Sequence, residues 1–450
     1  MKFPATHLAV RWPDGEQAAG TELECIIGRD FEVNADVLQD FSAKLLGDVE
    51  QDLVVVAGSI AYADRVIRRR RSKGWARTIH LSVPVLAGSV WKQARIIRAL
   101  IDTLGYLTGD YWNFEFTSDG QALTIPQSCI DFTRGNYVIL PFSDGLDSYL
   151  QWQLLLKEEL GSNILRVHTA SHASNRSRNR RIDAVGDPKG PRLSMPISLS
   201  TRDHAEPSYR TRTFLFYVIA ALAAHKVGTS RIVIGENGVG AIAPSMIPFG
   251  DECPHRATHP AFTRRLAGFV NQLLGSNIVF EHPQQYRTKG QVLIHALSLG
   301  VTGWQATRSC TRGPRAKLKG MSCGICGGCL LRRTAVAAAR QPKERYFWSD
   351  LSGTTLNDCR SEAGGRMSTA TDADIARHGT CDMSAFAALS EDAVPDVFEK
   401  AAWELVGRPG AELVSATAEL LTLAQRHATE WRDFRARFDE QGFLNRQREE

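Results

Sequence analysis

The chain has 450 residues, of which 43% are hydrophobic and 23% charged, and its formal net charge is +5. These are the values of a globular protein with a buried core, and so small a positive charge permits a basic patch without requiring nucleic acid. No apolar stretch approaches the roughly 20 residues of a membrane span, and the start of the chain lacks the apolar core of a signal peptide. We therefore expect a soluble cytoplasmic protein of roughly three domains, with no membrane partner and with reduced cysteines.

Residues 1–130 are expected to form a small α/β domain of unknown role. Helical periodicity runs over residues 53–70 and 91–107, and the alternation typical of strands runs over residues 77–85 and 111–116. No catalytic constellation occurs in this part of the sequence.

A basic run, residues 68–71 followed by Lys73, ends the first of these helices. It could contact an acidic partner or nucleic acid. We favour the solvated end of a helix, where cations complement the helix dipole.

A strand, a glycine-containing turn and a helix are predicted around residues 143–148, here called the serine loop. An apolar run over residues 137–140 precedes the loop, and helical spacing over residues 149–156 follows it. Backbone N–H groups at such a turn bind anions, and Gly145 permits a close approach. The alternative is an ordinary helix N-terminus capped by serine and aspartate.

Two features of the serine loop point to a nucleotide bound with a metal ion. Ser143 and Ser148 add hydroxyl donors for phosphate. Asp147 would be unfavourable at a bare phosphate site, so we expect a Mg²⁺ ion to accompany the phosphates.

The serine loop resembles the Ser-Gly-Gly-x-Asp-Ser pyrophosphate loop of PP-loop ATPases, which cleave ATP between the α- and β-phosphates and adenylate a substrate. It is not a Walker A loop, because it lacks the Gly-Lys-Ser/Thr ending. Asp144 stands where that family usually has its first glycine, and its charge would face phosphate or metal.

Residues 131–340 are expected to form a doubly wound parallel sheet, because a second strand is predicted over residues 163–169. His168 and Thr169 would end this strand, near where PP-loop enzymes hold adenine. The basic stretch 176–181 could close over phosphates, although exposure alone explains it equally well.

Arg210 and Arg212 fall in the first turn of an apolar helix predicted to start at Tyr209, run to His225 and be capped by Ser208. Cations are disfavoured at that end of a helix, so two arginines there indicate a bound phosphate or carboxylate, unless both point to solvent.

Glu236 and Asn237 follow a buried strand over residues 232–234, at the edge where a parallel sheet presents ligands. The alternative is a turn in which Asn237 tolerates left-handed geometry. Two weaker candidates are the helix starts at residues 258–260 and 288–290.

Four cysteines, Cys310, Cys323, Cys326 and Cys329, have the spacing of a zinc site with four thiolate ligands. A closed four-sulfur shell leaves no open position, so the metal would be structural, and Arg332 and Arg333 would offset its surplus negative charge. Buried free thiols and an iron–sulfur cluster are the alternatives.

Together, the serine loop and the cysteines resemble the 7-cyano-7-deazaguanine synthase (QueC) family, whose zinc site ends in a Leu-Arg sequence, here Leu331 and Arg332. The resemblance covers about residues 137–336. It implies an adenine nucleotide α-hydrolase-like fold and the use of ATP and ammonia to turn the carboxylate of 7-carboxy-7-deazaguanine into an amide and then a nitrile.

The resemblance also assigns roles to individual residues. Glu236 could accept hydrogen bonds from the N1–H and the exocyclic amine of a guanine-like base. The phosphates would be held by Ser143, Asp144, Gly145, Leu146, Asp147 and Ser148, with Asp147 near Mg²⁺; adenine would lie near His168 and Thr169; the substrate would meet Arg210, Arg212, Glu236 and Asn237; and Zn²⁺ would be held by Cys310, Cys323, Cys326 and Cys329.

The flanking sequence looks like the enlarged QueC-like proteins of bacterial anti-phage systems, such as the Qat system. That resemblance implies a protein partner that receives the activated deazaguanine. Residues 341–450 are expected to be mainly helical after a polar connector over residues 352–372. An apolar stripe within residues 412–443 favours core packing over partner docking.

Three classes of function compete. The first is a QueC-like, C–N bond-forming ligase that acts on a free base or a protein. The second is a PP-loop tRNA-modifying enzyme of the thiolase kind, which would need a catalytic cysteine and an RNA-binding surface. The third is a nucleotide-binding scaffold without catalysis, for which Asp144 is the hint.

Overall fold

The computed structural model describes residues 5–15, 23–33, 46–70, 72, 74–123, 136–159, 163–170, 192–200, 202–247, 250, 252–312, 321–359, 367–391 and 395–446. The basic stretch 176–181 lies outside these ranges.

A four-stranded parallel sheet is formed by the start of the chain, with the strand order β2-β1-β4-β5. Its alternating sequence places buried apolar side chains on the strands, as on Ile79, Leu81 and Val83. The two predicted helices are confirmed as α2 (Asp48–Val66) and α4 (Ala94–Thr108), and the two predicted strands as β4 (Thr78–Pro84) and β5 (Tyr111–Thr117), with shifted ends. Three elements, β1 (Thr6–Arg11), β2 (Leu23–Ile26) and α3 (Gly88–Trp91), were not predicted.

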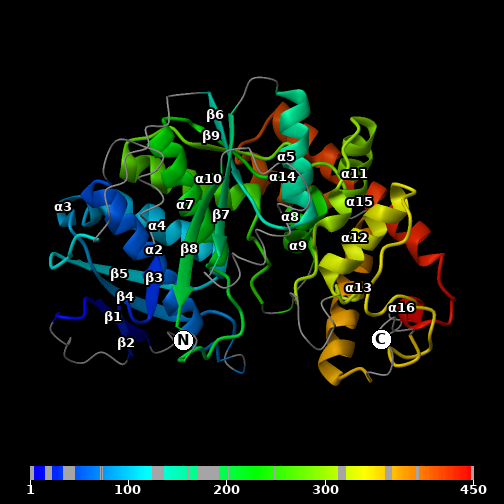
Figure 1. The fold of residues 1–450 in the computed structure, drawn as a ribbon, viewed down its shortest axis with the longest axis horizontal. Helices are drawn as coiled ribbons and strands as arrows, with labels where there is room; N and C mark the ends of the chain where they lie inside the picture. The colour runs from blue at the N-terminus through cyan, green and yellow to red at the C-terminus, as the bar shows by residue number, and fades with distance from the viewer. Residues whose placement is uncertain are drawn as a thin grey trace.

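A six-stranded sheet forms the centre of the molecule (Figure 1), in the order β10-β9-β6-β7-β8-β3. Its first five strands pair in parallel, and β3 adds an antiparallel edge. The strand order reverses between β6 and β9, which confirms the doubly wound parallel sheet. The strands are β3 (Phe31–Val33), β6 (Tyr137–Pro141), β7 (Asn163–Ala170), β8 (Arg192–Leu199), β9 (Arg231–Val233) and β10 (Val279–Glu281).

Helices cover both faces of the central sheet. On one face, α7 (Arg212–Val227) and α10 (Pro260–Leu274) share an apolar core with the N-terminal sheet and α2. On the other face, α5 (Leu146–Glu158) and α11 (Lys289–Ser298) pack in a separate core. Because one core and strand β3 join the two sheets, the N-terminal part packs directly on the centre; its boundary at residue 130 stays a prediction.

The end of the chain is helical, as predicted, and lies on the opposite side of the central sheet from the N-terminal sheet (Figure 1). Its apolar stripe is core: Trp431 and Phe434 are buried against the cysteine region. The helices are α12 (Gly327–Ala338), α13 (Ala370–Glu391), α14 (Pro395–Val406), α15 (Ala411–Arg435) and α16 (Phe443–Arg446). Among the described residues, no helix combines the length and the apolar character needed to cross a bilayer.

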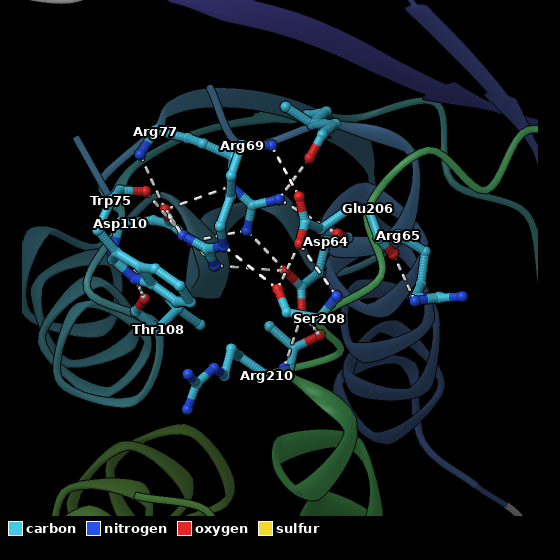
Figure 2. Close-up of polar contacts among 12 residues, drawn as sticks. Asp64, Arg65, Arg69, Trp75, Arg77, Thr108, Asp110, Glu206, Ser208 and Arg210 are labelled. Carbon is cyan, nitrogen blue, oxygen red and sulfur yellow. Dashed lines mark hydrogen bonds and ion pairs between the residues drawn. The ribbon is translucent and has the colours of Figure 1, made fainter. Parts of the chain in front are cut away.

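One basic residue corrects the expectation for the run at residues 68–71. Helix α2 ends at Val66, and Arg68 and Arg70 beyond it are exposed. Arg69 is instead buried, and its guanidinium donates to both oxygens of Asp110 at 2.6 and 2.8 Å (Figure 2). Arg69 is therefore structural, because its charge is needed beside Asp110.

Candidate functional site

The serine loop connects β6 to α5, and its two serines hold it together. The hydroxyl oxygens of Ser143 and Ser148 lie 3.1 Å apart, and the Ser148 hydroxyl donates to the Ser143 carbonyl at 3.0 Å. The Gly145 N–H donates to the Ser143 hydroxyl at 3.1 Å, and Gly145 is the residue that precedes the first turn of α5. A helix N-terminus thus opens directly on the carboxyl end of a central strand.

A cavity of about 400 Å³ lies beside the loop, at the carboxyl ends of β6, β7 and β9. This is the point where the strand order reverses, the usual ligand position in such sheets. The volume is that of an ordinary small-molecule site. The predicted residues that line this first cavity are Ser143, Gly145, Asp147, Ser148, Thr169, Arg212 and Glu236.

Other lining residues of the first cavity were not predicted from the sequence, except that Thr258 belongs to the weak candidate at residues 258–260. Tyr209, Phe216 and Tyr217 come from α7 and the segment before it, and His255 and Thr258 come from the segment before α10. Aromatic residues near a helix start carry no distinguishing signal, and only the folded chain brings them to the loop.

Three of the predicted residues, Asp144, Leu146 and His168, do not line the first cavity. Leu146 is buried in the core under α5. His168 is buried, with its Nδ1 atom 2.9 Å from the Phe142 carbonyl oxygen, because alternate residues of β7 face opposite sides. The Asp144 carbonyl oxygen accepts from the Arg308 N–H at 2.7 Å.

Arg210 also lies outside the first cavity, because α7 begins at Arg212 rather than at Tyr209 and is preceded by Thr211 instead of Ser208. The Arg210 guanidinium stands 4.8 Å from the ring centre of Trp75, beside the buried ion-pair network (Figure 2). Asp64 of α2 accepts from the Thr211 N–H at 2.8 Å and therefore caps α7. Arg212 is thus held at the cavity by an acid from the N-terminal part.

Asp147 is the centre of a polar cluster at the start of α5. Its two carboxylate oxygens accept from Asn237 at 3.0 Å and from the Lys289 ammonium at 2.5 Å. Asn237 also donates to Glu236 at 2.8 Å, and its own carbonyl oxygen accepts from the Gly240 N–H at 3.2 Å. Asn237 therefore has an extended backbone (φ −74°), caps the short helix that follows it and orients both acids. The left-handed turn considered for Asn237 is wrong.

Burial and neighbouring charges shift the pKa values of Glu236 and Lys289 in this cluster. Burial and the negative charge of Asp147 raise the pKa of Glu236 well above its ordinary value, although Lys289 opposes the shift. Burial disfavours the ammonium form of Lys289, but Asp147 and Glu236 outweigh it, so the pKa of Lys289 is raised. Because Glu236 is held largely in its neutral form, the cluster consists of the Asp147–Lys289 ion pair beside an uncharged acid that can still lose a proton.

From the sequence, Lys289 was only part of a weak candidate, the helix start at residues 288–290. Its only signal is that Thr288 starts a capping box with Gln291 at the beginning of α11. The side chain is 4% exposed and ion-paired with an acid far away in the chain. A buried lysine needs such a partner, but the partner is set by the fold.

A second cavity, of about 420 Å³, adjoins the first. Gly145, Asp147, Glu236 and His255 line both cavities. The short helices α8 (Gly238–Ala241) and α9 (Ala243–Met246) form one wall, and α13 forms another. Most of its other lining side chains are apolar: Val239, Ala243, Pro244, Ile247, Leu331, Met383 and Phe386.

The four predicted cysteines meet in one cluster, with all their sulfur atoms within 4.8 Å of one another. The Cys323 and Cys326 N–H groups point to the sulfurs of Cys310 and Cys323 at 3.5 and 3.4 Å. This arrangement can hold one metal ion, and donors to sulfur are usual in such sites.

The two arginines after the cysteines do not act on the sulfur charge by direct contact. Arg333 donates to the carbonyl oxygens of Gly324, Trp348 and Ser349 at 2.8–3.1 Å. Arg332 is ion-paired with Glu344 at 2.6 Å. They brace the cysteine loop through its backbone and the segment after α12.

Comparison with protein-family models matches residues 198–340 to the family described as queuosine biosynthesis protein QueC. The matched part contains Arg212, Glu236, Lys289 and the four cysteines, and it begins after the serine loop. No curated protein matches the chain. The match supports a QueC-like family for this part, with ATP-dependent chemistry related to 7-deazaguanine.

Proposed function

We propose that the protein is a ligase that uses ATP to activate the carboxylate of a 7-deazaguanine acid, releasing AMP and pyrophosphate. The observation that carries the proposal is the first cavity. It lies where the strand order reverses, it is bordered by the N-terminus of α5, and it contains Asp147 and Glu236. The QueC match over residues 198–340 supports the substrate class.

In this proposal the serine loop is a PP-loop that binds the ATP phosphates. The N–H groups at the start of α5, the hydroxyls of Ser143 and Ser148 and the Arg212 guanidinium supply donors for anionic oxygens. Asp147 would hold Mg²⁺, which would neutralise charge on the phosphates. The carboxylate fits that role because its oxygens keep further acceptor capacity.

The proposed reaction has two steps. A carboxylate oxygen attacks the α-phosphorus, the bond from that phosphorus to the bridging oxygen breaks, and its electron pair leaves with pyrophosphate. An amine then attacks the acyl carbon of the adenylate, AMP leaves, and the nitrogen loses a proton to form an amide. Two adjoining cavities that share four residues suit such a reaction, because they hold two reactants side by side.

The cysteine cluster is proposed to hold a structural Zn²⁺ ion. Three of its four members are buried, and all four sulfurs converge on one point. No open ligand position is left for catalysis, so the ion would stabilise the fold.

We propose further that the amine belongs to a protein partner in an anti-phage system rather than to ammonia. The resemblance of the flanking sequence to enlarged QueC-like proteins supports this choice. Intact mass measurement of a partner produced together with this protein tests it: an added deazaguanine amide is expected, and nitrile product made from free ammonia alone would contradict it.

The central experiment is nucleotide analysis with 7-carboxy-7-deazaguanine. AMP and pyrophosphate are expected to form only when the acid is present. Asp147→Asn is expected to abolish their formation at a temperature where the variant is folded, because an amide oxygen is a poor Mg²⁺ ligand. It is also expected to lower the melting temperature, because it leaves the buried Lys289 ammonium without its charged partner. Formation of ADP and inorganic phosphate would remove the PP-loop assignment.

A further inference from the structure

Two buried polar atoms without a hydrogen-bond partner belong to neighbouring residues that line the second cavity. They are the Nη2 atom of Arg308 and the hydroxyl oxygen of Ser309. A buried guanidinium nitrogen and a buried hydroxyl each lose free energy when left unpaired. Within the described residues, the protein thus leaves a cationic donor and a neutral donor on adjacent residues of a cavity that has an apolar wall and, near the serine loop, the Asp147–Lys289 pair.

The backbone holds this pair of donors beside the serine loop. The Arg308 N–H donates to the Asp144 carbonyl oxygen at 2.7 Å. On the other side, a Cβ atom added at Gly328 would overlap the Ser309 carbonyl oxygen, so the first turn of α12 fits closely against this segment. Arg308 and Ser309 are therefore fixed between the proposed phosphate loop and the cysteine cluster.

The second cavity offers an apolar wall that suits a ring and, at Arg308, a cationic donor that suits an anion. Its walls include Ile247 of the segment after α9, Leu331 of α12 and Phe386 of α13, which suit a ring system and not a polyphosphate chain. A guanidinium with a neighbouring hydroxyl is a strong donor set for a carboxylate.

We propose that the second cavity binds the ring of an aromatic heterocyclic acid and that Arg308, with Ser309, binds its carboxylate. The identity of the acid rests on the proposed function. Glu236 lines the same cavity and would accept from the N–H groups of the ring, whereas Arg210, predicted for the carboxylate from sequence, lies against Trp75. Helix α13 would then form one wall of the substrate site.

The test compares two probes, 7-carboxy-7-deazaguanine and 7-deazaguanine, which lacks the carboxylate. Their equilibrium binding is measured without turnover in the wild type, Arg308→Gln and Phe386→Ala. Arg308→Gln is expected to weaken binding of the acid about thirtyfold, the usual effect of losing a charged hydrogen-bond partner, and to leave 7-deazaguanine binding unchanged. Phe386→Ala is expected to weaken both probes.

Control measurements distinguish loss of the Arg308 contact from unfolding and from a change in ATP binding. Arg377→Gln removes an exposed arginine from α13 and is expected to leave both affinities unchanged. ATP affinity and the melting temperature of Arg308→Gln are expected to equal those of the wild type, and Arg308→Lys is expected to restore part of the acid binding.

Acid binding that stays within twofold of the wild type in Arg308→Gln would overturn the proposal. So would a variant that binds the acid normally but transfers it slowly to an amine, because the cavity would then hold the acceptor. If the wild type binds the acid through Arg308 but forms no AMP, the proposed function fails and the binding site stands.

Discussion

Glu236 lines both cavities, and the protonation state of its side chain determines which hydrogen bonds it can accept. Burial and Asp147 raise its pKa, so a larger share of the side chain is neutral near physiological pH than for an ordinary carboxyl group. Only the deprotonated form accepts from two N–H groups at once. The residue therefore makes recognition of a guanine-like edge dependent on pH.

We expect kcat/KM for the acid to increase as pH rises through the raised pKa of Glu236, because the carboxylate is the accepting form. Glu236→Gln should remove that increase and lower kcat/KM about thirtyfold at alkaline pH, the cost of a charged hydrogen bond. Steady-state AMP release between pH 6 and pH 9 checks this, with ATP affinity as the control. If the Gln variant keeps the wild-type pH profile, another group is responsible.

At this scale the sequence was informative where chemistry is local. The serines and Asp147 lie within six residues of each other, and the cysteines have a spacing that few other structures require. Arg308 was not predicted and Lys289 was only part of a weak candidate, because the role of each depends on contacts between segments that are distant in the chain.

Helix α11 carries Lys289 to the site, and helix α15 holds the start of α11. The Thr288 hydroxyl donates to Glu430 of α15 at 2.5 Å. Gly290 lets the helices come this close, since an added Cβ atom would lie 2.6 Å from the Glu430 carboxylate. Burial raises the pKa of Glu430 to about 7, although the Thr288 hydrogen bond opposes the shift.

This contact predicts a pH dependence of stability. The folded protein binds the Glu430 proton more tightly than the unfolded chain, so its contribution is complete below the ordinary pKa of 4.5 and is lost as pH rises to about 7. The free energy of unfolding of Glu430→Gln, relative to wild type, should therefore increase by on the order of 2 kcal/mol between pH 5 and pH 8.

Denaturant unfolding at several pH values measures this difference. Glu419→Gln changes an exposed residue of the same helix and should show no such trend. A pH-independent difference for Glu430→Gln would mean that Glu430 stays ionised in the folded protein.

The long helices and half of the strands were predicted from the sequence, whereas β1, β2, β3, β8 and β10 and the contacts between distant elements were not. Periodicity gave strands and helices because buried faces repeat every two or 3.6 residues. The start of α7 was placed three residues early at Tyr209, because its cap comes from Asp64 in another helix and not from the adjacent Ser208.

At the scale of the molecule, buried ions connect the N-terminal sheet to the central one. Arg69 and Arg77 both pair with Asp110, and Arg77 pairs also with Asp64, the cap of α7 (Figure 2). Burial alone would raise the pKa of Asp110, but Arg77 and Arg69 outweigh it and lower the pKa. The acid is therefore charged and fully dependent on its partners.

Asp110→Asn is expected to lower the free energy of unfolding by about 3 kcal/mol, because it leaves two buried guanidinium groups undercompensated. Denaturant unfolding measures this loss. Glu412→Gln removes one partner of an exposed pair with Arg408 and should leave the unfolding midpoint unchanged. Equal effects of the two variants would show that the buried network adds no stability.

The cysteine cluster has a comparable role at the other end of the molecule. Cys323, Cys326 and Cys329 share an apolar core with Trp348 and Trp431, which joins α12 to the C-terminal helices. Cys326→Ser is expected to lose the metal and to lower the melting temperature, since structural zinc contributes directly to folding. Elemental analysis should find one zinc per wild-type chain, and a metal-free wild type with unchanged stability would contradict the assignment.

Strand β3 has a consequence for how the protein is made. Phe31 pairs with Leu199, and Val33 pairs with Ile197. The ribosome therefore releases one strand of this pair long before the other, and β3 remains without its partner while the whole N-terminal sheet and the serine loop are synthesised. Contacts between such distant residues form slowly, so the N-terminal segment has to wait for the central sheet during synthesis.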